Sequence, residues 1–180
     1  MTAHQDVLDF WFTETAPAQW WAADPAFDSL ITQRFGALHA RAAQAELAAW
    51  RANPQGRLAE VLVLDQFSRN IHRGSKQAFA QDGMALVLAQ EAVACGADQT
   101  LPPLERGFLY MPYMHSESRA IHGQALALFE ALGNASQLDF ERRHQAIVER
   151  FGRYPHRNAM LGRESTTEEL QFLTLPGSAF

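Results

Sequence analysis

The sequence predicts an all-α protein. Strand signals are almost absent, because β-branched residues are few and no segment alternates cleanly between apolar and polar residues. Ala, Leu, Glu, Gln and Arg dominate the stretches in which apolar residues recur at helical spacing. Short turns separate these stretches, so we expect antiparallel helix pairs, arranged either as stacked helical hairpins of the repeat-solenoid kind or as an irregular multi-helix bundle. No repeating sequence period decides between the two.

The first half of the chain shows clear helix boundaries. We expect helices over residues 4–13, from 24 to beyond 38, over 57–72 and over 76–95. Asp24 is expected to cap the second helix, with Pro25 as its first helical residue. Leu47–Trp50 either continues that helix or forms a short one of its own, and Gly96 ends the helix over 76–95.

The second half is divided in the same way by Pro, Gly and Ser. Helices are expected over residues 102–112, 116–133, 136–152, 155–161 and 165–173. Ser116 is predicted to cap one of them, and Gly133 to end it. The stretch Ser165-Thr166-Thr167-Glu168 is predicted to form a capping box for the last helix.

Length, charge and cysteine usage limit the function classes. A chain of 180 residues is near the usual size of one domain, so we expect a single all-helical domain over residues 1–180. A net charge of −5 argues against nucleic acid as a partner, because phosphate neutralisation needs a basic face. No apolar run approaches a membrane span and no signal-peptide pattern occurs, so no membrane association is expected.

Cysteine usage and the absence of certain motifs limit the cellular location and the cofactors that we expect. The single cysteine, Cys95, cannot form an internal disulfide, which fits a reducing, cytoplasmic location. There is no phosphate-cradling glycine loop, no dinucleotide fingerprint and no His-Glu-x-x-His pattern, so neither a cofactor nor a metal is expected. No heptad pattern predicts an oligomeric state.

Polar residues follow an entirely apolar turn, Val61–Leu64, which is typical of a buried helix. At helical spacing these polar residues continue the apolar face of the helix and the face next to it, so we expect some of them to be buried. One interpretation is a structural Asp65–Arg69 ion pair; the other is a cleft that binds a ligand. The ligand-binding candidates here are Asp65, Gln66, Arg69, Asn70 and Arg73.

A second segment places His115 and Glu117 beside Ser116 at an element boundary. A histidine and a carboxylate there have the chemistry of an acid–base pair. His115 and Glu117 are therefore catalytic candidates, together with His156 from the third segment.

The third segment combines a helix end at Gly152 with a helix start at Pro155, among several arginines. Exposed amides beside guanidinium groups have the composition of an anion site. Alternatively, Asp65, Glu117 or Glu164 supplies the negative partner from within the protein and the arginines form an internal network. The ligand-binding candidates here are Arg153, His156, Arg157, Asn158 and Arg163.

Four strings, one near the start of the chain and three in or around these segments, resemble the DUF924 family, and the resemblance covers nearly the whole chain. They are Leu8-Asp9-Phe10-Trp11-Phe12; Leu64-Asp65-Gln66-Phe67-Ser68-Arg69-Asn70 with Arg73-Gly74; His115-Ser116-Glu117; and Arg150-Phe151-Gly152-Arg153-Tyr154-Pro155-His156-Arg157-Asn158 with Gly162-Arg163. The resemblance implies an all-α fold similar to tetratricopeptide-type hairpin stacks and no known reaction. The family often has proline at position 68 and an aromatic or other residue at 72, which argues against catalytic roles for Ser68 and His72.

Three functions remain open from the sequence. The first is a binding module whose concave helical surface holds a small anion or a carboxylate-bearing peptide end. The alternative is a hydrolase or lyase that uses His115 or His156 as acid–base group, with Glu117 or Asp65 orienting it and arginines holding the substrate. The third is a purely structural role, in which the polar strings form a buried network that fixes helix register.

Overall fold

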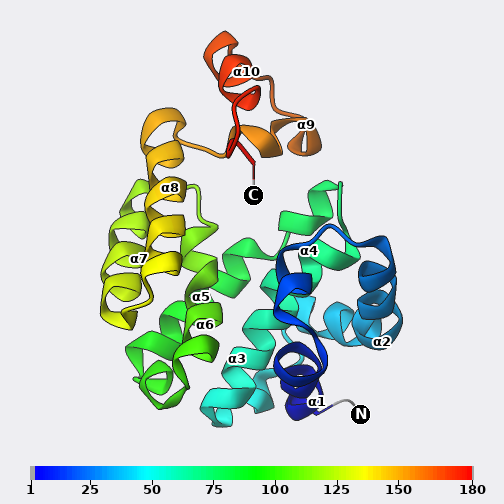
Figure 1. The fold of residues 1–180 in the computed structure, drawn as a ribbon. Helices are drawn as coiled ribbons and strands as arrows, with labels where there is room; N and C mark the ends of the chain where they lie inside the picture. Colours follow the sequence, from blue (N-terminus) through cyan, green and yellow to red (C-terminus); the bar gives the residue numbers. More distant parts are fainter. Residues whose placement is uncertain (1–2, 180) are drawn as a thin grey trace. The chain divides into compact units, whose positions relative to one another are not determined.

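The computed structural model describes residues 3–179, and their regular secondary structure is helical (Figure 1). Within this range no residue is assigned to a strand, which confirms the all-α prediction. The chain divides into two compact units by its internal contacts. Unit 1 contains the residues up to Arg73 together with Gln77–Pro112, and unit 2 contains Gly74–Lys76 and the residues from Tyr113 onward. The expectation of a single domain stays a prediction.

Unit 1 is built around a set of mostly short helices. Their bounds are α1 His4–Asp9, α2 Pro25–Ala43, α3 Pro54–Leu62, α4 Ser68–Ile71, α5 Asp82–Ala94 and α6 Pro103–Met114, of which α6 is in unit 1 up to Pro112. Short 3-10 turns cover Pro17–Trp21, Ala48–Ala52, Lys76–Phe79, of which Lys76 belongs to unit 2, and Ala97–Thr100. Its core is rich in aromatic rings: the ring centroid of Phe35 lies 5.0 Å from those of both Phe10 and Phe67.

Two of the family-like strings of unit 1 adopt π-helical turns. These are Phe10–Glu14, directly after α1, and Val63–Phe67, which joins α3 to α4 in one continuous helical segment. A π turn shifts the backbone hydrogen bonds by one residue, so carbonyls of that turn need other donors. The Ser68 hydroxyl donates to the Leu64 carbonyl at 2.6 Å, and the Arg69 guanidinium donates to the Asp65 carbonyl at 2.8 Å.

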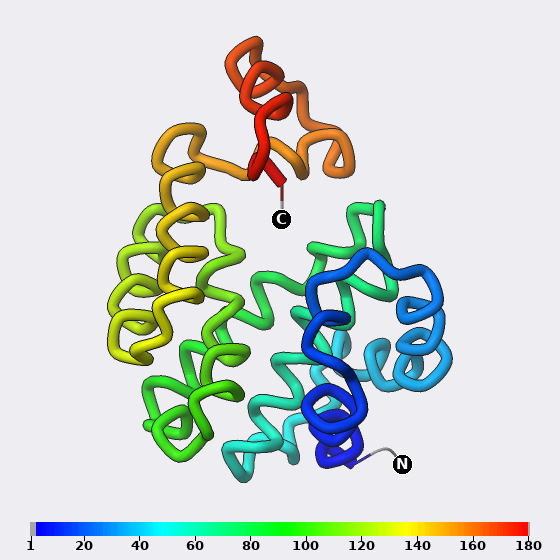
Figure 2. Tube along the Cα trace, in the orientation of Figure 1, coloured from blue at the N-terminus to red at the C-terminus, as the bar shows by residue number. Residues whose placement is uncertain are grey.

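Unit 2 consists of a long helical hairpin and a compact C-terminal segment. Its helices are α7 Arg119–Leu132, α8 Ala135–Phe151, α9 Asn158–Leu161 and α10 Thr167–Leu173, with a 3-10 turn over Pro155–Arg157. The chain reverses between α7 and α8, and the two helices lie side by side (Figures 1 and 2). Gly133 and Gly152 end them in the left-handed region, at φ 74° and 70°, as the sequence predicts.

Several predicted boundaries need correction. The helix expected over residues 57–72 begins earlier, at Pro54, because the Asn53 side chain caps it by accepting from the Gly56 amide. The segment expected to be one helix over residues 76–95 is a 3-10 turn over Lys76–Phe79 followed by α5, whose first residue, Asp82, accepts hydrogen bonds from Arg69. α6 continues past Pro112 to Met114.

Ser116 is not the N-cap of α7. Its hydroxyl accepts a hydrogen bond from the Ser118 amide in the preceding turn, and Ser118 occupies the cap position. The capping box of α10 lies one residue later than expected, between Thr166 and Glu169.

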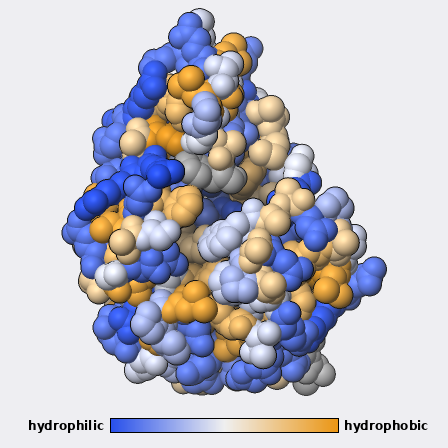
Figure 3. Space-filling view, viewed as in Figure 1, coloured by the Kyte–Doolittle hydropathy of each residue, from blue (hydrophilic) through white to orange (hydrophobic). Residues whose placement is uncertain are grey.

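The visible surface mixes hydrophilic and hydrophobic residues, as Figure 3 shows. The large hydrophobic side chains that are exposed among the described residues are Trp21, Leu30, Val87, Leu104, Phe140, Leu170 and Leu175. None of the helices within the described part of the chain is long and apolar enough to cross a membrane.

Candidate functional site around Tyr154

The polar string of unit 1 is held by carboxylates of the same unit. Asp65 is buried at 1% exposure; its carboxylate accepts a 2.6 Å hydrogen bond from the Gln66 amide and lies 3.2 Å from the Arg69 guanidinium. Arg69 also donates to both carboxylate oxygens of Asp82, at 2.9 and 3.1 Å. Three of the five candidates in this segment, Asp65, Gln66 and Arg69, therefore form one linked network.

The remaining candidates of unit 1 converge on Asp28, a residue of α2. The Asn70 amide donates to the Asp28 carboxylate at 2.8 Å, and Arg73 binds both of its oxygens, at 2.5 and 2.8 Å. Burial alone would raise the pKa of Asp28, but the hydrogen bonds from Arg73 and Asn70 outweigh it and leave the pKa lowered. These contacts tie α2 to α4.

Ser68 is not arranged as a nucleophile. It is fully buried, and its hydroxyl hydrogen points to the Leu64 carbonyl. The Nε2 atom of His39, 2.7 Å from the Ser68 oxygen, is therefore the donor and not a base. Burial lowers the pKa of His39, and the neighbouring His72 lowers it further. The arrangement supports the sequence argument against a catalytic Ser68.

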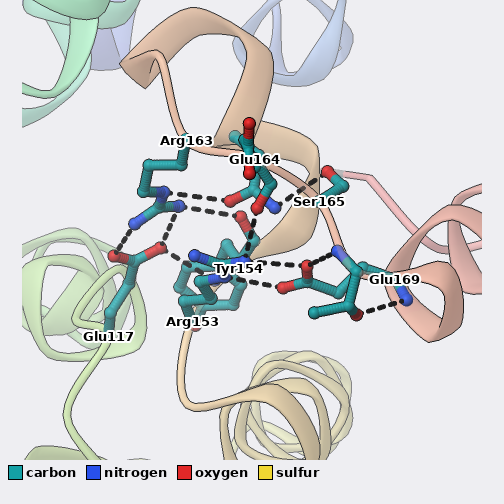
Figure 4. A network of polar contacts seen from close by, with 9 residues as sticks. Glu117, Arg153, Tyr154, Arg163, Glu164, Ser165 and Glu169 are labelled. Carbon is teal, nitrogen blue, oxygen red and sulfur yellow. Dashed lines mark hydrogen bonds and ion pairs between the residues drawn. The ribbon is translucent and has the colours of Figure 1, made fainter.

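In unit 2, Glu117 lies at one side of the network drawn in Figure 4, where its carboxylate faces Arg163. Its carboxylate accepts two hydrogen bonds from the Arg163 guanidinium, at 2.7 and 2.9 Å, and one from the Tyr154 amide at 2.8 Å. Burial tends to raise the pKa of Glu117, but the Arg163 and Tyr154 hydrogen bonds dominate and hold it below its usual value. Arg163 also donates to the Asn158 side chain at 2.9 Å. Glu117 is therefore an ionised anchor for two segments of unit 2.

Arg153 is paired with a carboxylate that the sequence did not suggest. Its guanidinium donates to both oxygens of Glu169, at 2.6 and 2.8 Å, and to the Glu164 carbonyl at 2.8 Å (Figure 4). Glu169 is at the same time the N3 residue of the α10 capping box, and it accepts from the Thr166 amide. The Arg153 hydrogen bond, together with that of Thr166, lowers the pKa of Glu169 to about 2.

Tyr154 is completely buried and connects these ion pairs to a second polar group. Its hydroxyl donates to the Met114 carbonyl at 2.5 Å and lies 3.1 Å from Nε2 of His122. His122 and Glu141 are both fully buried, and Nδ1 of His122 lies 2.7 Å from a Glu141 carboxyl oxygen. Burial raises the pKa of Glu141, and the bond to His122 offsets only part of that effect.

Further basic side chains surround the Tyr154 ring. The guanidinium carbon of Arg157 lies 4.6 Å from the ring centroid, and the rings of His144 and His156 lie 5.7 Å from it. His144 is buried, and burial lowers the pKa of His144 to about 3, because the hydrogen bond to the Phe140 carbonyl offsets only part of that effect. We call Tyr154 and the groups around it the Tyr154 cluster: His115, Glu117, His122, Glu141, His144, Tyr154, His156 and Arg157.

The cluster brings together candidates from two predicted segments. His115, Glu117, His156 and Arg157 all belong to it, whereas Arg153, Asn158 and Arg163 lie in the adjoining ion-pair network. Among the described residues no group of three or more His, Cys, Asp or Glu side chains is arranged to hold a metal ion.

Sequence reasoning missed His122, Glu141 and His144. A signal was available, since each of them occupies a position in an otherwise apolar helical stripe: His122 with Ala125 and Phe129, and Glu141 and His144 with Val148. A charged residue at such a position is a candidate buried group.

The fold and these networks define a class: an all-α protein whose polar strings are buried or half-buried in ion-paired networks. The profile described as "Bacterial protein of unknown function (DUF924)" matches residues 7–177, and the chain belongs to this family. The chain is also similar to the solved structure of a protein of unknown function from Agrobacterium tumefaciens, at 40% identity and a TM-score of 0.90, over 94% of this chain and 96% of the other. A comparison with curated proteins finds no match.

Proposed function

We propose that the protein is a binding module for a small anion, and that the basic side chains of the Tyr154 cluster contact it. The observation that carries the proposal is the position of Arg157 and His156 beside one buried tyrosine ring, at 4.6 and 5.7 Å from its centroid. A guanidinium stacked on an aromatic ring is pre-oriented, so little side-chain entropy is lost when it binds an anion.

The electrostatics of unit 2 support the same proposal. The guanidinium charge of Arg157 is among the causes that disfavour a proton on the buried His144. A guanidinium charge in the cluster favours an anionic ligand. His115 and His156 are only partly buried, so the cluster includes side chains that solvent reaches.

Arg153 and Arg163 have a different part in this proposal. Each is held by a two-point pair with Glu169 or Glu117, so their charges are balanced within unit 2. They hold the segment that carries His156 and Arg157 in place and do not contact the ligand.

Isothermal titration calorimetry on the full chain tests the proposal. The probes are inorganic phosphate, succinate, and one short peptide in two forms, with a free and with an amidated C-terminus. We expect saturable binding of at least one anion and, for Arg157→Gln, a Kd raised about tenfold or more, which corresponds to roughly 1.4 kcal/mol. Preference for the free over the amidated peptide would assign the anion to a peptide end.

The matched control is Arg150→Gln, which removes the same charge from an exposed arginine of unit 2 that pairs with Glu168. Absence of saturable binding to the wild-type chain, or equal weakening by Arg157→Gln and Arg150→Gln, contradicts a site at the cluster.

A hydrolase or lyase is the second candidate, because His156 and Glu117 both contact Tyr154, one through its ring and one through its amide. The lowered pKa of Glu117 and its hydrogen bonds from Arg163 suit an orienting role and not proton transfer. Incubation of the wild-type chain with carboxylic and phosphoric ester substrates, followed by product analysis, separates the two functions. Turnover that His156→Gln abolishes while binding persists supports the enzyme; a bound but unchanged ligand supports the binding module.

A further inference from the structure

His122 and Glu141 form a buried pair, and their contacts limit the number of protons that the pair can hold. Nε2 of His122 faces two oxygen atoms: the Ser116 carbonyl at 2.9 Å and the Tyr154 hydroxyl oxygen at 3.1 Å. The Tyr154 hydrogen is already donated to the Met114 carbonyl. Both oxygens are therefore acceptors, and Nε2 carries a hydrogen.

On its other side, His122 shares one proton with Glu141 across the 2.7 Å contact between Nδ1 and Oε1. Removing that proton leaves a buried carboxylate facing the Nδ1 lone pair. Adding a second proton creates a buried cation, and the other Glu141 oxygen, Oε2, is buried without a hydrogen-bond partner. The closed structure therefore holds one shared proton, whether this is drawn on nitrogen or on oxygen.

His144 adds a second buried imidazole to the same cluster. Its Nδ1 lies 2.7 Å from the Phe140 carbonyl one helical turn earlier, and its ring packs edge-on against Tyr154. The other titratable or charged groups of the cluster are His115, after α6; Glu117, before α7; and His156 and Arg157, after α8. A proton on His144 would add charge beside Arg157, in a buried position.

We propose that His122, Glu141 and His144 form a proton-operated latch that keeps the α7–α8 hairpin closed most firmly near pH 6.5 and loosens it on either side. This device does not depend on the proposed anion site. It follows from the difference in proton content between the closed cluster and an open state in which the three side chains reach water.

The numbers of protons bound in the closed and open states give the direction of the pH dependence above and below pH 6.5. An imidazole in water binds a proton below about pH 6.5, and a carboxyl group below about pH 4.5. Above pH 6.5 the open His122–Glu141 pair has lost the proton that the closed pair keeps, so opening releases one proton and becomes tenfold more favourable with each pH unit of increase.

Between pH 6.5 and 4.5 the open pair holds one proton, as the closed pair does, and only His144 takes one up on opening. Opening then becomes tenfold more favourable with each pH unit of decrease. The lowered pKa of His144, about 3, supports this step because the closed imidazole stays neutral over the whole interval.

Hydrogen exchange of the full chain from pH 4 to 9, corrected for the intrinsic exchange rate, tests the latch. We expect the protection of the α7 and α8 amides to be greatest near pH 6.5 and to fall about tenfold per pH unit on each side. Amides of α3 in unit 1 provide an internal reference. Protection that is constant from pH 5 to 8 overturns the proposal.

Two variants test the alkaline and the acid decrease in protection separately. Glu141→Gln has an amide N–H that can still donate to Nδ1 of His122 but does not titrate, so it should lose the alkaline decrease and steepen the acid one to about a hundredfold per pH unit. His144→Asn, whose amide can still donate to the Phe140 carbonyl, should lose the acid decrease down to pH 4.5 and keep the alkaline one. An unchanged alkaline side in Glu141→Gln overturns the proposal.

If a variant fails to fold, ¹⁵N NMR of the wild-type imidazoles tests for the single shared proton. The ring ¹⁵N shifts of His122 should stay constant from pH 5 to 8. A His122 ring that titrates near pH 6.5 contradicts the single shared proton.

Discussion

The guanidinium of Arg163 forms a two-point ion pair with the carboxylate of Glu117, 46 positions away in the sequence, at 2.7 and 2.9 Å. The same carboxylate accepts the Tyr154 amide. This pair therefore fixes the segment after α8 against the loop before α7, both within unit 2. It also shows why a sequence motif rich in arginine need not be an open anion site.

Replacing Glu117 with Gln should destabilise the protein by about 1–3 kcal/mol. The variant loses the charge-assisted bonds to Arg163, while its amide oxygen can still accept from Tyr154. Denaturant unfolding followed by far-UV circular dichroism measures the loss. The control is Glu130→Gln, which breaks an exposed 3.5 Å pair with Arg142 and should change stability by about 0–1 kcal/mol. Equal effects of the two substitutions would show that the Glu117 pair has no special weight.

The capping box of α10 should lose its electrostatic support in acid. Because the pKa of Glu169 is lowered from 4.5 to about 2, its stabilising contribution is present above pH 4.5 and is lost as the pH falls toward 2. Carboxyl ¹³C NMR should place the Glu169 midpoint near 2, and Arg153→Gln should move it toward 4.5. A Glu169 midpoint that Arg153→Gln leaves unchanged would contradict the assigned cause.

Gly56 should not tolerate a methyl group. A Cβ atom there would lie 2.0 Å from the Trp50 carbonyl oxygen, so the backbone must shift. We expect Gly56→Ala to destabilise the protein by about 3 kcal/mol or more. Gly36→Ala is the control, since its Cβ would meet only the Thr32 methyl group at 4.0 Å and it lies inside α2; it should be neutral or stabilising by up to about 1 kcal/mol. Thermal unfolding of both variants checks the contrast.

Ser68→Ala should cost about 1–3 kcal/mol, because it removes the hydroxyl bond to the Leu64 carbonyl and the Ser68 partner of the buried Nε2 of His39. Ser29→Ala is a close control: its hydroxyl makes the same kind of bond to the carbonyl four residues earlier, but on the surface. It should change stability by less than about 0.5 kcal/mol. If both variants unfold at the same denaturant concentration, the hydrogen bonds of Ser68 do not stabilise the π turn.

Helix boundaries were predictable where the cause is local. Asp24 caps α2 through the Ala26 and Phe27 amides, and Gly133 ends α7 in a left-handed conformation, because both effects depend on neighbouring residues alone. The π turns were not predictable, since apolar periodicity over a few residues does not distinguish one backbone register from another.

The partners of the polar residues were only partly predictable. Glu117 was among the carboxylates expected to neutralise an arginine, and it binds Arg163. Glu169 was not, because its role depends on tertiary packing that brings α10 to Arg153. His122 and Glu141 were missed for the same reason, although their positions in apolar stripes were visible.

Amide chemical-shift mapping of the full chain with inorganic phosphate tests whether the Tyr154 cluster binds an anion, as we propose. We predict saturable shifts of the amides of His115, Tyr154 and residues 156–158, all with one Kd. Shifts that do not saturate, or that are spread over exposed arginines such as Arg142 and Arg143, would contradict the claim and leave the cluster as a structural network.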